Sequence, residues 1–74
     1  MSCSLHLITE SGEIHLEMPL HESAEEVLNT CTEGMRGGRV LEFPDCLAPG
    51  ATERTTIVVN FGRVGVAWVE VRQV

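Results

Sequence analysis

The side chains best suited to chemistry in this sequence are three cysteines and three histidines, because it holds no Lys, no Tyr and a single Asp, Asp45. The missing Lys and Tyr exclude Schiff-base and phenol-based catalysis. The single Asp excludes a metal site built on paired aspartates. The search for a catalytic or metal site therefore narrows to Cys and His, with Glu, Ser and Thr as the remaining partners.

The cysteines and histidines are not spaced as metal ligands usually are. Cys3 and His6 stand three residues apart in a predicted strand, so their side chains point to opposite faces of it. No Cys-x-x-Cys or His-x-x-x-His occurs, and Cys31 belongs to the apolar stripe of a predicted helix. We therefore expect thiols that are buried or without a chemical role, no bound metal and no cofactor.

Cys46 is the best candidate for a reactive thiol, because we expect it in an exposed loop. The carboxylate of the adjacent Asp45 would raise the thiol pKa and disfavour the nucleophilic thiolate. Nothing in the sequence supplies a base to activate it. We expect a protein that is not an enzyme.

A glycine-rich segment, Gly34 to Arg39, could in principle hold an anion between backbone amides and two arginines. A P-loop follows a strand and opens a helix, whereas this segment follows a predicted helix and enters a predicted strand. We interpret it as a connection that ends the helix. Arg36 and Arg39 remain a possible docking point for an acidic partner.

Charge is distributed unevenly along the 74 residues, whose net charge is -6. Residues 1–33 carry seven Glu and no Lys or Arg. This acidic half would repel phosphate backbones, so we expect no nucleic-acid partner. It marks either a solvated surface or a face that meets a basic protein, and in the second case the acidic face consists of Glu10, Glu13, Glu17, Glu25 and Glu26.

The longest uncharged apolar run, Val64 to Val69, is much too short to span a bilayer, so we expect no membrane segment. The first residues lack the basic flank of a signal peptide. These two observations predict a cytoplasmic protein that forms a single small domain over residues 1–74.

The stretch from Ser4 to Leu20 has the pattern of a β-hairpin whose two-residue loop is Ser11-Gly12. This loop would place Glu10 opposite Glu13 and His6 opposite Glu17, with an ion pair between the last two. The same register gathers apolar side chains on one face of the hairpin, namely Leu5, Leu7, Ile14, Leu16 and Met18.

A capping box, Ser23-Ala-Glu-Glu26, predicts the start of a helix, and Gly34 is its expected end. After the glycine-rich connection, residues 39–43 have the pattern of a short strand that Pro44 ends. Residues 45–54 are then expected to form a loop.

The most apolar and β-branched stretch, Thr55 to Val71, is interrupted by Asn60-Phe-Gly-Arg63 and therefore reads as a second hairpin. If Phe61-Gly62 is its two-residue loop, both faces of this terminal hairpin are apolar, one with Ile57, Val59, Val64, Val66 and Trp68, the other with Val58, Gly65, Ala67, Val69 and Val71. A longer turn through Asn60 to Arg63 would change the partners but still leave apolar residues on both faces. One short helix hardly suffices to cover both. The missing cover would be the first hairpin or another copy of the protein.

These patterns together predict an α+β fold with the order β-β-α-β-β-β, a mostly antiparallel sheet and one helix packed on it. We expect a non-catalytic protein-interaction module that forms a homo-oligomer through its C-terminal β-hairpin. The predicted interface is Val58, Gly65, Ala67, Val69 and Val71. The alternative is an acidic inhibitor or regulator that docks its Glu-rich half on a basic surface of another protein.

Overall fold

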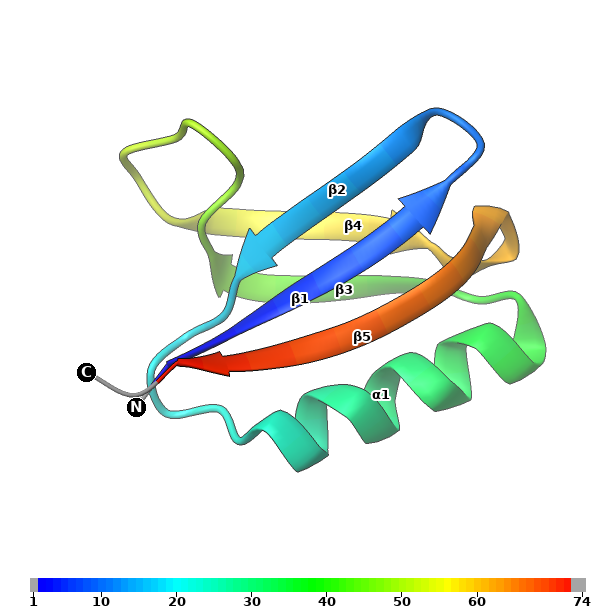
Figure 1. Ribbon diagram of the computed structural model, residues 1–74, viewed down its shortest axis with the longest axis horizontal. Coiled ribbons are helices and arrows are strands. Elements are labelled where there is room, and N and C mark those ends of the chain that lie inside the picture. The colour runs from blue at the N-terminus through cyan, green and yellow to red at the C-terminus, as the bar shows by residue number, and fades with distance from the viewer. Residues whose placement is uncertain (1, 73–74) are drawn as a thin grey trace.

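The computed structural model describes residues 2–72 and has the predicted α+β class and element order (Figure 1). The elements are β1 (Ser2–Thr9), β2 (Gly12–Glu17), α1 (Ala24–Gly37), β3 (Val40–Cys46), β4 (Thr55–Asn60), the 3-10 turn η1 (Phe61–Arg63) and β5 (Val64–Arg72). The strands form two antiparallel sheets, one with the order β2-β1-β5 and one of β3 and β4.

The predicted terminal hairpin is wrong, because β4 pairs with β3 and β5 pairs with β1. The reason is the turn η1, in which the side chain of Asn60 accepts a hydrogen bond from the Gly62 amide at 3.0 Å. The Phe61 amide donates to the Arg39 carbonyl at 2.8 Å and holds the turn beside the start of β3. The chain therefore leaves one sheet and enters the other, so that β4 and β5 each turn one side toward the core.

The first hairpin has the predicted faces but different partners. Its loop is Glu10-Ser11, so Thr9 lies opposite Gly12, and Leu7 lies opposite Ile14. The Thr9 hydroxyl closes this turn by accepting from the Ser11 amide and donating to the Gly12 carbonyl, both at 3.1 Å. Each partner differs from the prediction by two residues, and a shift of two leaves the faces of a strand unchanged.

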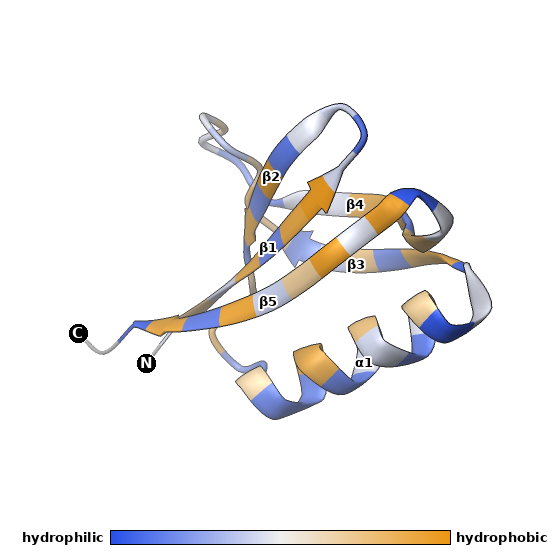
Figure 2. Cartoon of the chain, turned by 45° about the vertical axis from the view of Figure 1, so that its right-hand side comes forward, coloured by the Kyte–Doolittle hydropathy of each residue, from blue (hydrophilic) through white to orange (hydrophobic). Residues whose placement is uncertain are grey.

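The helix begins as predicted, since the Glu26 amide donates to the Ser23 hydroxyl at 3.1 Å. The predicted end at Gly34 is wrong, because α1 continues to Gly37 and the left-handed residue is Gly38, with φ of 59°. Gly34 is buried within the helix and lies against Phe61. Figure 2 shows the hydrophobic residues of α1 turned toward the sheets and its hydrophilic residues turned away.

Strand β3 continues through Pro44 instead of ending there, and the predicted loop accordingly begins two residues later. The strand pairing is irregular between Phe43 and Cys46, where Asp45 has the left-handed φ of 56°. Proline is tolerated at such irregularities because no ladder hydrogen bond is required from it. The Arg54 guanidinium donates to the Asp45 carbonyl at 3.0 Å, which ties the following loop to the bend.

The core lies between the two sheets and is completed by α1. Phe43 of β3 and Phe61 of η1 form its aromatic centre, with ring centroids 6.0 Å apart. The buried apolar side chains come from every element except β5, namely Cys3, Leu5, Leu7, Leu16, Met18, Val27, Cys31, Phe43, Cys46, Val59 and Phe61. Ala67 and Val69 of β5 pack against this cluster while staying partly exposed.

Candidate functional site

The three cysteines are free thiols buried in the core. Cys46 is fully buried, so the expectation of an exposed loop cysteine is wrong, because β3 extends to this residue. Burial raises the pKa of the Cys46 thiol, and Asp45 raises it further against the opposing effect of Arg54. Burial also raises the pKa of Cys31 to about 11. Neither thiol has the environment of a nucleophile.

Cys3 and His6 lie on opposite faces of β1, as their spacing predicted: Cys3 is in the core and His6 is on the other side of the sheet. Within residues 2–72, no group of three or more Cys, His, Asp or Glu side chains is arranged to hold a metal ion.

The first surface is the outer face, by which we mean the side of the β2-β1-β5 sheet turned away from the core. His6 occupies its middle, with His15 and Trp68 directly opposite it on the two neighbouring strands. The His6 ring stacks on Trp68, with centroids 5.0 Å apart and planes 7° from parallel. One row further along, Ile8 lies between Glu13 and Val66.

Carboxylates lie near both ring nitrogens of His6. Its Nε2 makes a hydrogen bond of 3.0 Å with Glu70 Oε2, whereas its buried Nδ1 lies 3.5 Å from Glu13 Oε1 and has no hydrogen-bond partner among the described residues. The predicted ion pair with Glu17 is wrong, because the register of the first hairpin places His15 opposite His6. The side chain of His6 is only 14% exposed, so it supports the flat face of Trp68 rather than reaching into solvent.

The outer face carries an exposed apolar patch, which we call the outer patch. It consists of Ile8, Val66 and Trp68, which are 41%, 50% and 38% exposed. Ile8 and Val66 are direct partners across β1 and β5, and Trp68 follows Val66 on the same face of β5. Adjacent exposed apolar side chains on a sheet are typical of a contact surface.

The five residues of the predicted interface do not form one surface. Ala67 and Val69 turn toward the core, opposite Leu7 and Leu5. The others are exposed at separate places, Val58 on β4 and both Gly65 and Val71 on β5. The prediction assumed that β4 and β5 pair, and the outer patch was missed because its Ile8 was assigned to a different hairpin.

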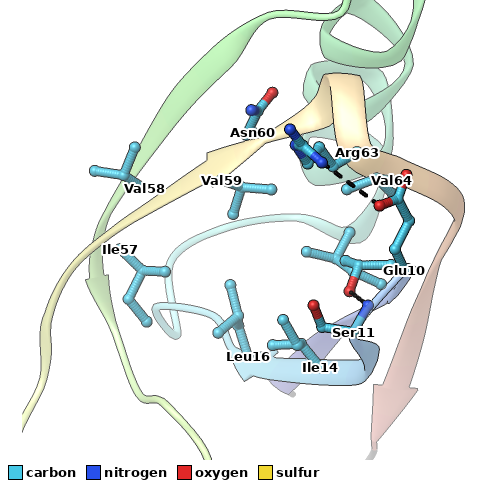
Figure 3. A pocket seen from close by; sticks show the side chains of 12 residues that line it. Glu10, Ser11, Ile14, Leu16, Ile57, Val58, Val59, Asn60, Arg63 and Val64 are labelled. Carbon is cyan, nitrogen blue, oxygen red and sulfur yellow. Dashed lines mark hydrogen bonds and ion pairs between the residues drawn. The ribbon is translucent and has the colours of Figure 1, made fainter.

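The second surface is an apolar groove of about 290 Å³ between β2 and β4, the edge strands of the two sheets (Figure 3). Its walls are mainly aliphatic, with Ile14 and Leu16 on one side and Ile57 and Val59 on the other. At one end Glu10 and Arg63 lie 3.5 Å apart and join the hairpin tip to η1. At the far end of β2, Glu17 and Leu47 exchange two backbone hydrogen bonds of 2.9 Å.

The residues of the predicted acidic face divide into two groups. Glu10, Glu13 and Glu17 follow the first hairpin, at the loop and along β2. Glu25 and Glu26 lie in the first turn of α1, where their negative charges interact favourably with the positive end of the helix dipole. Of these five residues Glu10 lines the groove, whereas Glu13 and Glu17 lie on the outer face, opposite Ile8 and Ser4.

No protein-family model, curated protein or solved structure matches this chain. Over residues 2–72, no helix combines the length and the apolar character needed to cross a membrane.

Proposed function

We propose that this protein is a non-catalytic protein-interaction module that self-associates through the outer patch. The observation that carries this proposal is the exposure of Ile8, Val66 and Trp68 side by side on the outer face. The surface differs from the predicted one, since it combines β1 with β5 instead of β4 with β5.

The size of the domain and the charges of the outer face support a second copy as the partner. A domain of 74 residues buries a small core, and oligomerisation is a common way to stabilise it. The outer face carries Glu13 and Glu70, whereas Arg72 follows Glu70 at the next position of that face. A two-fold contact could therefore pair opposite charges around an apolar centre.

Native mass spectrometry of the untagged protein at increasing concentration tests self-association. We expect a dimer or a larger oligomer at high micromolar concentration, and Val66→Lys should lower its apparent affinity about tenfold or more, because a charge would be desolvated at the contact. The matched control is Val40→Lys, since Val40 is also on a strand and 60% exposed. A monomer at every concentration, or equal effects of both variants, would remove the proposal.

The second candidate function is that of an acidic regulator that binds a basic protein surface. The observation that favours it is the series Glu10, Glu13 and Glu17 along one hairpin. Such binding should weaken steeply with added salt, because it depends on exposed charges. Replacing the three residues by Gln should abolish capture of a basic partner, whereas capture that is insensitive to salt would contradict this function.

A further inference from the structure

We infer that the groove between β2 and β4 binds an extended, basic segment of a partner protein, which adds to the edge of β2 as a further strand. The proposal does not depend on the outer patch. It deepens the acidic alternative by giving it a site and a class of partner. Its three supports are the open edge of β2, the apolar groove beside that edge and the charges along the strand.

The edge of β2 offers backbone groups for pairing. The strand pairs with β1 on one side, and on its other side the only backbone partner within residues 2–72 is Leu47, opposite Glu17. In an antiparallel ladder the groups of alternate residues point the same way, so those of His15 and Glu13 point outward like those of Glu17. Edge strands of this kind accept an added strand.

Leu47 already occupies the first position of such a strand. Its amide donates to the Glu17 carbonyl and its carbonyl accepts from the Glu17 amide, both at 2.9 Å. The chain then enters the loop before β4, whose first residues, Ala48 to Ala51, border a small pocket together with His15 and Glu17. A partner segment that continues from this point along β2 would pair with His15 and Glu13 in the same register.

The groove suits the side chains that this added strand would turn inward. Side chains alternate along a strand, so the inward positions would lie beside Ile14 and Leu16 and face Ile57 and Val59 across the groove. A volume of about 290 Å³ is at the lower end for small-molecule pockets, which makes it a place for a few aliphatic side chains. An alternating segment could fill it without moving either sheet.

The outward side chains of the added strand would lie opposite Glu13 and His15, with Glu17 diagonally beside the second position, and these two carboxylates favour Lys or Arg there. The same charges argue against a second copy in this place. Pairing β2 with β2 of another copy would bring like carboxylates together. A basic segment with alternating aliphatic residues is therefore the occupant that fits both sides of the strand.

The experiment is titration of the isotope-labelled protein with the blocked peptide acetyl-Arg-Val-Arg-Val-Arg-Val-amide, followed by NMR. We expect shifts concentrated at residues 12–16 and 57–60, and slower hydrogen exchange of the Glu13 and His15 amides. Ile14→Gln should weaken binding about tenfold, because an aliphatic contact is lost from the groove. The matched control Ile8→Gln should bind normally, since Ile8 and Ile14 are both 41% exposed on opposite faces of one hairpin.

Two further peptides keep the test decisive if Ile14→Gln fails to fold. A peptide N-methylated at its arginine amides should not bind, because these are the amides that would pair with Glu13 and His15. A Glu-Val repeat should not bind because of its charge. The proposal of an added strand in the groove would be overturned if the N-methylated peptide bound equally well. It would also be overturned if binding were sensitive to salt but unaffected by Ile14→Gln, and the acidic regulator would then remain as the explanation. Concentration-dependent shifts at residues 12–16 without peptide would identify a second copy and overturn the partner segment.

Discussion

At the scale of single residues, the three thiols are the most reactive type of side chain in the protein, but burial suppresses their reactivity. Cys31 packs on the core side of α1 and is almost completely buried. Its pKa rises from 9.0 to about 11 because burial disfavours the thiolate. The three cysteines therefore act as small apolar residues in the core.

Cys31 makes the stability of the protein depend on pH in the alkaline range. The thiol holds its proton more tightly in the folded state than in the unfolded state, so its contribution is fully present below pH 9 and is lost as the pH rises toward 11. The denaturant midpoint should fall over this range. Cys31→Ala should shift the whole curve and flatten this part of its slope. An unchanged slope in the variant would show that other groups cause the dependence.

Gly34 is a second residue whose neighbourhood decides its role. A Cβ at this position would lie 2.8 Å from Phe61 and 2.9 Å from Leu41. Its smallness lets α1 approach η1 and β3 closely, although a glycine inside a helix usually lowers stability by about 0.5–1 kcal/mol relative to alanine.

Gly34→Ala should therefore destabilise the fold by about 1 kcal/mol, because overpacking of about 1–3 kcal/mol exceeds the gain in helix propensity. Thermal or urea unfolding measures this difference. Gly37→Ala is the control, since its nearest neighbours belong to the flexible side chain of Arg39. A stabilised Gly34→Ala variant would show that the helix can shift away from Phe61.

At the scale of elements, the sequence predicted what depends on local chemistry. The Ser23 cap gave the helix start, and the alternation of β1 and β2 gave the buried face of the first hairpin. The loop of that hairpin was misplaced because Ser11-Gly12 has the composition of a tight turn, whereas the Thr9 hydroxyl stabilises a turn one residue earlier. A side-chain hydrogen bond of this kind leaves no periodic pattern.

The pairing of the last two strands could not be read from their sequence. Asn60 to Arg63 resembles a hairpin loop in composition, yet the contact of Phe61 with Arg39 and Phe43 fixes it as a corner between two sheets. Such contacts join residues about twenty positions apart. The predicted interface followed from the wrong pairing, which is why it divides between the core and the surface.

At the scale of the whole molecule, the two proposed surfaces use opposite faces of the same sheet. The outer patch lies on the side away from the core, and the groove opens at the edge where β2 faces β4. Ile8 and Ile14 therefore separate the two functions experimentally. Self-association and peptide binding should respond to different members of this pair, because Ile8 belongs to the outer patch and Ile14 lines the groove.

The pairing of β1 with β5 also governs when the protein can fold during its synthesis. Ser2 lies opposite Arg72, so the middle strand of the larger sheet cannot complete its pairing until β5 has been synthesised. Until then β1 has β2 alone beside it, and an isolated hairpin is marginal in water. Until β5 is in place, that edge of β1 therefore has no partner strand.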